Sequence, residues 1–211
     1  IAWDILSYYA YLPALVVEKD ITLSFYKSEP DKYKEKYWPS VDSKGNQVIK
    51  TTSGLAYFYA PGFFIAHALA EPLGYPADGF SVPYVFALVM ILVLYMGIGM
   101  FFLAKVLLRY FPPIPVAITL FSVFLGTNLF YYSSFEPAMS HAYSFVLFSI
   151  FLYLTPLWLE KPSIGRTIGI GLLAGIIVLV RPTNIIIGLF PLLWGVTSIA
   201  MLIQRIQWLF S

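Results

Sequence analysis

The chain has 211 residues, of which 59% are hydrophobic and 11% are charged, and its formal net charge is +2. A soluble domain carries roughly 25% charged residues, so this composition excludes an ordinary soluble enzyme and indicates a polytopic membrane protein. The basic residues are scattered without a basic stripe, which argues against nucleic acid as a partner, and the absence of cysteine excludes disulfides and thiolate metal sites.

The chain opens at Ile1 and closes at Ser211, with no signal peptide at its start. We therefore expect a fragment that lacks a first membrane helix and a C-terminal part.

Residues 1–79 form a polar segment that holds nine of the eleven acids and seven of the thirteen basic residues. We expect a first helix from Asp4 to Val17, with Asp4 as a plausible N-cap and a kink at Pro13. Residues 27–50 are rich in charged and turn-forming residues, which predicts a solvated excursion with a turn at Asp42 to Gly45.

A second helix is expected over about 61–71, with Pro61 in its first turn. A helix of this length is too short to cross a membrane, which needs about 20 apolar residues, so we expect it to lie in the interface. His67 and Glu71, four residues apart, would pair on its wet side.

Residues 80–211 read as a bundle of about five transmembrane helices, so the predicted fold class is an all-α polytopic bundle with a long extracytoplasmic first loop. The expected spans are 80–104, 114–135, 141–159, 167–180, which is only marginally long, and 185–203. Basic residues of the short loops fall on one side, which the positive-inside rule makes cytoplasmic. They are Lys105, Arg109, Lys161, Arg166 and Arg205.

The opposite face, periplasmic if the source is bacterial, would then gather residues 1–79, the loop at Glu136–His141 and the run Arg181–Asn184. Ionisable residues at a membrane face are costly, which favours a functional site. The candidates are Asp4, Lys50, His67, Glu136, His141 and Arg181, with Asn128 and Asn184 as neutral supports. Carboxylates can act as general bases, and basic side chains bind phosphate, so this set suits a substrate that is both lipid and phosphate.

Each candidate also has an ordinary structural interpretation. Asp4 can be only an N-cap, Lys50 a solvated lysine, and Glu136 a carboxylate that favours a helix start. His141 can form a hydrogen bond inside the bundle, and Arg181 can snorkel to the lipid headgroups. No His-x-x-x-His or His-x-Glu spacing occurs, so the sequence does not support a divalent metal, and it indicates no other cofactor.

Four stretches resemble a known family. They are Asp4 followed by Ser7 to Ala14, Lys50 with the Gly54 to Phe64 segment, Phe135–His141, and Arg181–Asn184. Together they resemble the GT-C integral-membrane glycosyltransferases, in the bacterial branch related to protein O-mannosyltransferases and the aminoarabinose transferase of lipid A.

The resemblance implies inverting transfer of a sugar from a polyprenyl-phosphate donor to a glycan, lipid or protein acceptor, at the periplasmic face of a bacterial inner membrane. It implies Asp4 as the catalytic acid or base. From the polar residues gathered at this face we take Glu136 as a second catalytic candidate. We expect substrate binding by Tyr8, Lys50, His141, Arg181 and Asn184. The acidic pair usual in the family is not evident, because Trp3 and Ile5 flank a lone Asp4.

Two other classes of function stay open. A transporter or flippase of lipid-linked sugars would have ionisable residues and broken helices near mid-membrane, whereas the charges here sit at the ends of the spans. A non-catalytic membrane assembly subunit is the third interpretation, and activity alone would separate it from the first.

Overall fold

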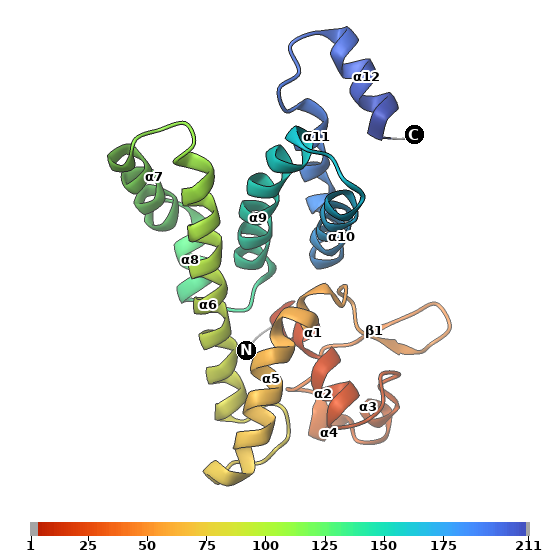
Figure 1. Cartoon of the computed structure of the whole chain (residues 1–211). Coiled ribbons are helices and arrows are strands. Elements are labelled where there is room, and N and C mark those ends of the chain that lie inside the picture. Colours follow the sequence, from red (N-terminus) through yellow and green to blue (C-terminus); the bar gives the residue numbers. More distant parts are fainter. Residues whose placement is uncertain (1–3, 210–211) are drawn as a thin grey trace.

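One long helix, α6 (Val82–Leu107), runs along much of the molecule (Figure 1). The structure is a computed structural model that describes residues 4–209 and is mostly helical. Residues three or four apart on α6 form a narrow buried stripe of Tyr84, Leu88, Leu92, Met96 and Gly99. The remaining faces of α6 are also apolar, and side chains such as Phe86, Val93 and Phe101 are exposed. A helix that is apolar all round suits a lipid surrounding.

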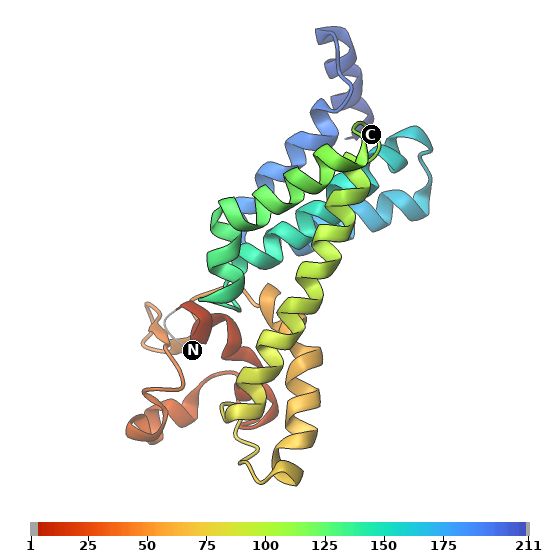
Figure 2. The same cartoon turned by 90° about the vertical axis from the view of Figure 1, so that its left-hand side faces the viewer.

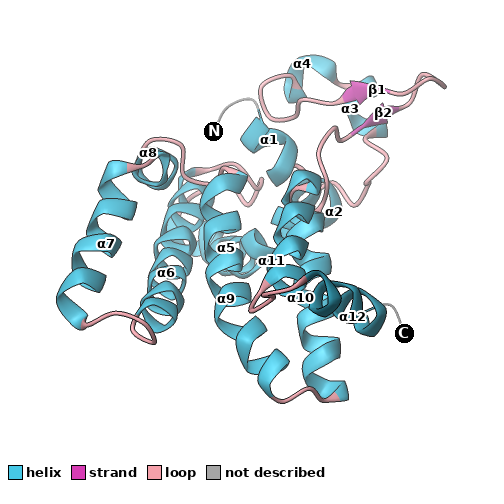
Figure 3. Cartoon of the chain, turned by 90° about the horizontal axis from the view of Figure 1, so that it is seen from above, coloured by secondary structure: helices cyan, strands magenta, loops and turns pink. Residues whose placement is uncertain are grey.

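Helix α9 (Ser140–Glu160) packs along the C-terminal half of α6, and α10 (Ile164–Val180) packs on α9. Seen from above, α6, α9 and α10 follow one another across the bundle (Figure 3). A Cβ added at Gly99 would lie 3.1 Å from the Val146 Cα, so this glycine permits the close approach of α6 and α9.

Two helices, α6 and α9, are long and apolar enough to cross a membrane. Helices α7 (Pro113–Gly126) and α8 (Asn128–Ser134) make a third candidate if they are one span bent by 63°. These helices indicate a membrane protein. Their bounds match those of the spans predicted at 80–104 and 141–159, whereas the helix predicted over 114–135 is broken at Thr127.

The last two predicted spans differ more. Helix α10 has 17 residues and is about 26 Å long, which is less than the roughly 30 Å of a hydrocarbon core. The continuous helix predicted over 185–203 was wrong. That stretch holds the 3₁₀ helix η2 (Pro182–Gly188), then α11 (Leu189–Leu193), and the beginning of α12 (Ile199–Leu209). Gly195, at φ +70°, turns the chain between α11 and α12, and apolar composition does not reveal such a break.

The polar N-terminal segment lies to one side of the helices (Figure 2). Its first predicted helix is two helices, α1 (Asp4–Tyr9) and α2 (Tyr11–Val16), which meet at Ala10. Pro13 has no N–H for the carbonyl of Tyr9 and its ring crowds that carbonyl, which explains the break. Two short helices follow, α3 (Ser24–Ser28) and α4 (Pro30–Tyr33).

The predicted turn at Asp42 to Gly45 is confirmed, and it connects two strands that the all-α prediction missed. Strands β1 (Ser40–Val41) and β2 (Gln47–Val48) pair antiparallel. Asp42 accepts the backbone N–H and the side-chain amide of Asn46 and the backbone N–H of Lys44, and these hydrogen bonds hold the pKa of its carboxyl below the usual range.

Helix α5 (Gly54–Ala70) begins well before the predicted 61, and the 3₁₀ turn η1 (Glu71–Leu73) follows it. Pro61 therefore lies inside the helix, on its exposed side, instead of in the first turn. The predicted pairing of His67 with Glu71 was also wrong. His67 instead places Nδ1 2.5 Å from the Tyr84 hydroxyl and stacks on Phe63, so it joins α5 to α6.

Candidate functional site

The loop between α8 and α9, residues 135–139, is held in a tight and strained turn. Ala138 has φ +90°, a conformation that is uncommon for a residue with a Cβ. The Ala138 carbonyl accepts the hydroxyl of the fully buried Tyr59 from α5, and Met139 N–H donates to the Glu136 carbonyl. These bonds fix the loop against α5. Backbone strain of this kind occurs most often at functional sites.

His141 lies in the first turn of α9, directly after this loop, and two side chains from other elements enclose it. The Tyr132 ring of α8 stacks on the imidazole, with ring centroids 4.1 Å apart and an interplanar angle of 16°. Arg181 places Nη1 3.1 Å from the His141 Nδ1 and 3.5 Å from its Nε2. A guanidinium can only donate, so the imidazole nitrogen that accepts from it carries no proton.

Arg181 is directed to His141 by the way α10 ends. Arg181 is the C-cap of α10 and has extended backbone angles, as expected for a residue before proline. The chain then continues as η2, in which the buried Asn184 donates to the Ser144 hydroxyl at 2.8 Å and to the Ile177 carbonyl at 3.3 Å. Asn184 thereby ties the segment after Arg181 to α9 and α10.

The N-terminal segment joins the same place through the start of α5. Thr52 donates to the Val180 carbonyl at 3.5 Å. A Cβ at Gly54 would come within 2.4 Å of the Leu179 backbone, so α5 touches the last turn of α10 at a position where only glycine fits. The residues just before Arg181 are therefore in contact with the polar segment, as the gathering of segments at one face predicted.

The two carboxylates proposed for catalysis lie on neighbouring segments. The start of α1, whose first residue is Asp4, lies beside the α8–α9 loop that carries Glu136 (Figures 1 and 2). Asp4 is exposed and has no hydrogen-bond or ion-pair partner in the described part of the chain, whereas Glu136 is half-buried and accepts from the Tyr131 hydroxyl at 3.2 Å. Tyr8 is half-buried and packs against the main hydrophobic core.

Lys50 lies at the edge of this arrangement. It is exposed, its ammonium lies 5.4 Å from the centroid of the Trp38 ring, and Thr51 and Thr52 follow it in sequence. The structure therefore brings His141 and Arg181 into contact, and the Asn184 backbone N–H donates to the Arg181 carbonyl at 2.9 Å. Lys50 and Tyr8 have no contact with this pair among the described residues. The substrate roles of all five stay predictions.

Sequence reasoning missed several residues of the site. Tyr131 and Tyr132 contact Glu136 and His141, and Ser144 holds Asn184. The two tyrosines lie four and five residues before Glu136, on the last turn of α8. That spacing was the signal in the sequence that could have placed them beside Glu136. Ser144 follows His141 by three residues inside an apolar run, where a serine gives no signal of its own.

The opposite end of the bundle holds the basic residues of the short loops. The guanidinium of Arg109 lies 4.8 Å from the centroid of the Tyr153 ring, and Arg166 donates to the carbonyls of Leu157 and Lys161. The C-terminal ends of α6 and α9 thus lie together, at the end away from His141. These basic residues therefore share one end of the bundle, and the side of the membrane that this end faces stays a prediction.

Within residues 4–209 no group of three or more histidine and acidic side chains is arranged to hold a metal ion. Comparison of the chain with protein-family models, with curated protein sequences and with solved structures found no match.

Proposed function

We propose that this protein is a membrane glycosyltransferase that moves a sugar from a polyprenyl-phosphate donor to an acceptor hydroxyl at the extracytoplasmic face, with inversion at the anomeric carbon. The observation that carries the proposal is the contact between Arg181 and His141 at the end of the bundle where Glu136 and the start of α1 also lie. A fixed cation at the end of the bundle where carboxylates also lie suits a substrate with a lipid tail and a phosphate.

Each group has a role in this proposal. Asp4, which is exposed and unpaired among the described residues, takes the proton of the acceptor hydroxyl as general base. The acceptor oxygen then bonds to the anomeric carbon while the bond from that carbon to the phosphate oxygen breaks. The lipid phosphate leaves with the electron pair, and Arg181 stabilises its negative charge. Glu136 is the second candidate for the base, and Lys50, His141, Asn184 and Tyr8 bind or position the substrate.

The proposal is tested by transfer of radiolabelled sugar from polyprenyl-phosphate donors, using the full chain in lipid, with wild type beside Asp4→Asn. We expect Asp4→Asn to abolish turnover and to keep donor binding, because an amide has nearly the shape of a carboxylate but cannot accept the proton. Asp31→Asn is the matched control, since Asp31 is an exposed acid in the same polar segment and its one ion pair within residues 4–209 is with Lys34.

The outcomes separate the candidates. Normal turnover in Asp4→Asn together with loss in Glu136→Gln would move the base to Glu136. Absence of turnover with every donor, in a chain that is folded and binds donor, would refute the glycosyltransferase proposal.

A transporter of lipid-linked sugars is the second candidate, and one observation favours it. The α7–α8 pair is bent by 63° at Thr127, and broken helices are common in transporters. The residues at this break, Gly126, Thr127 and Asn128, are uncharged, however, whereas transporter sites usually carry ionisable groups there. Movement of a lipid-linked sugar across vesicles containing the pure protein, without sugar transfer, would place this candidate first.

A further inference from the structure

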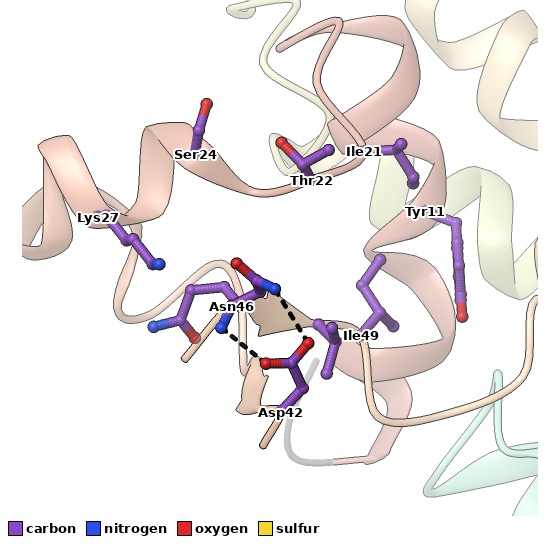
Figure 4. A pocket seen from close by; sticks show the side chains of 10 residues that line it. Tyr11, Ile21, Thr22, Ser24, Lys27, Asp42, Asn46 and Ile49 are labelled. Carbon is purple, nitrogen blue, oxygen red and sulfur yellow. Dashed lines mark hydrogen bonds between the residues drawn. The ribbon is translucent and has the colours of Figure 1, made fainter. Parts of the chain in front are cut away.

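A pocket of about 520 Å³ opens between the β-hairpin and the segment that joins α2 to α3 (Figure 4). Lys27, Asp42 and Gln47 contribute polar groups, and Tyr11, Ile21 and Ile49 contribute apolar surface. The volume falls within the range of about 300–1,000 Å³ that is typical of sites for small molecules.

The walls of this pocket are fixed by internal hydrogen bonds. Asp20 accepts from the backbone N–H and the hydroxyl of both Thr22 and Ser24, which holds the upper wall. Asp42 holds the hairpin turn in the same way, and Lys27 donates to the Gly45 carbonyl at 2.8 Å across the gap. In Figure 4 the ammonium of Lys27 points toward the hairpin. A pocket with walls held in place loses little freedom when it binds a ligand.

Several groups that face the pocket keep unused hydrogen-bonding capacity. An ammonium has three donors, and Lys27 uses one of them on Gly45. The Gln47 amide has no hydrogen-bond partner within residues 4–209, so both its donors and its acceptor are available. The hydroxyls of Thr22 and Ser24 donate to Asp20, which leaves their lone pairs as acceptors. The pocket therefore offers donors and acceptors together.

Among the residues that line the pocket the charges cancel, and the Asp20 carboxylate behind the upper wall is occupied by its four hydrogen bonds to Thr22 and Ser24. Lys27 is its cation and Asp42 its anion, and three hydrogen bonds from Lys44 and Asn46 keep Asp42 ionised. An anionic ligand would meet the fixed carboxylate of Asp42, and a cationic ligand would meet the ammonium of Lys27. The charge balance thus favours a neutral ligand with many hydroxyl groups.

We propose that this pocket binds a neutral saccharide unit. Each hydroxyl of a sugar ring can both donate and accept a hydrogen bond, which matches the donors of Lys27 and Gln47 and the acceptors of Gln47 and Asp42. The C–H face of the ring would pack on Tyr11 and Ile49. The Tyr11 ring is held for this contact, because its hydroxyl donates to the Thr51 carbonyl at 2.5 Å.

The pocket is connected to the candidate site through Thr51 and Thr52. Thr51 accepts from Tyr11, and the next residue, Thr52, donates to Val180, which precedes Arg181. The assignment of the bound saccharide as part of a glycan acceptor rests on the proposed function, whereas binding itself does not.

The test measures binding of glucose, mannose, N-acetylglucosamine and maltose by saturation-transfer NMR and titration calorimetry, without any donor. The full chain is held in lipid nanodiscs, since detergents with sugar headgroups would compete. We expect at least one saccharide to bind with a Kd of about 1 mM or tighter, and Gln47→Ala to weaken it about tenfold. Lys44→Ala is the matched control, because Lys44 lies in the same hairpin, is exposed and does not line the pocket.

Circular dichroism checks that the variants are folded. If Gln47→Ala disturbs the hairpin, Gln47→Glu replaces it, because it keeps the length and the acceptor but removes the donors. The proposal is overturned if no saccharide binds, if Gln47→Ala and wild type bind equally, if phosphate binds in preference to sugars, or if only an extended peptide binds. Saccharide binding without transfer would contradict the glycosyltransferase proposal alone, and transfer without this binding would contradict the pocket alone.

Discussion

Arg181 and His141, 40 residues apart in the sequence, meet with 3.1 Å between the guanidinium Nη1 and the imidazole Nδ1. The contact joins the end of α10 to the start of α9, and the Tyr132 ring of a third element, α8, stacks on the His141 imidazole. A permanently charged guanidinium with no carboxylate partner among the described residues keeps most of its donors free for an anion. This relationship is the basis of the first prediction.

Replacing Arg181 by glutamine should lower kcat/KM for sugar transfer by about 100- to 1,000-fold, as the loss of one preorganised donor to a developing anion does elsewhere. Arg181→Lys should recover part of that loss, because it keeps the charge but not the planar fork. Arg109→Gln is the control, since Arg109 lies at the opposite end of the bundle over Tyr153. Equal rates for Arg181→Gln and wild type would remove Arg181 from the site.

The link between Asn184 and Ser144 should be measurable in stability. Asn184→Ala should lower the free energy of unfolding by about 1–3 kcal/mol, because it leaves the buried Ser144 hydroxyl and Ile177 carbonyl without this donor. Adding Ser144→Ala should cost less than the sum of the two single changes, as a double-mutant cycle in detergent would show.

The control for this cycle is Ser149→Ala. Ser149 donates to the Phe145 carbonyl of its own helix and has no bond to η2. Its effect should add to that of Asn184→Ala. Coupling of the same size for both serines would mean that the Asn184–Ser144 bond does not hold the two segments together.

The long elements of the fold were predictable from the sequence, because α6 and α9 each contain an uncharged run of about 20 residues or more. The contact between distant polar segments at one end of the bundle was also predictable, since charged residues mark the ends of apolar helices. The breaks within the apolar helices were not predictable. Thr127 separates α7 from α8 by capping the new helix with its hydroxyl, and a threonine in an apolar run is common in continuous helices as well.

The pairing of individual side chains was predictable only in part. His141 and Arg181 were chosen because ionisable residues at a membrane face are costly, and the structure brings them together. His67 was assigned to Glu71 from helical spacing, but packing of α5 on α6 gave it Tyr84 instead. Helical spacing predicts only which side chains are neighbours on one helix. It does not reveal a partner on a second helix that packs against the first, as Tyr84 does here.

Gly54 should tolerate no side chain. A Cβ there would overlap the Leu179 backbone at 2.4 Å, and backbone atoms cannot turn aside as a flexible side chain does. Gly54→Ala should lower the free energy of unfolding by about 1–3 kcal/mol despite the higher helix propensity of alanine, and should also reduce transfer by displacing Arg181. Gly175→Ala is the control in α10, since nothing lies within 4 Å of its added Cβ and its unfolding midpoint should hold or rise. A stable and active Gly54→Ala variant would contradict the close contact of α5 with α10.

The ion pair between Lys36 and Asp78, at 2.7 Å and half-buried, should make stability depend on pH. Burial alone would raise the pKa of Asp78, but hydrogen bonds from Lys36 and from the backbone N–H groups of Phe80 and Ser81 together lower the pKa below its usual value. A lowered pKa means that the carboxylate stabilises the folded state above pH about 4, and that this contribution is lost as the pH falls through the folded pKa. Lys36→Met should therefore lower the free energy of unfolding by about 1 kcal/mol at pH 7, and the difference from wild type should shrink as the pH falls below about 4. Thermal unfolding of Lys36→Met and wild type between these pH values measures this difference in stability.

The control is Lys34→Met, which breaks the exposed pair with Asp31 and should have the same stability as wild type at either pH. A stability difference between Lys36→Met and wild type that stays constant with pH would show that Asp78 is not the group responsible.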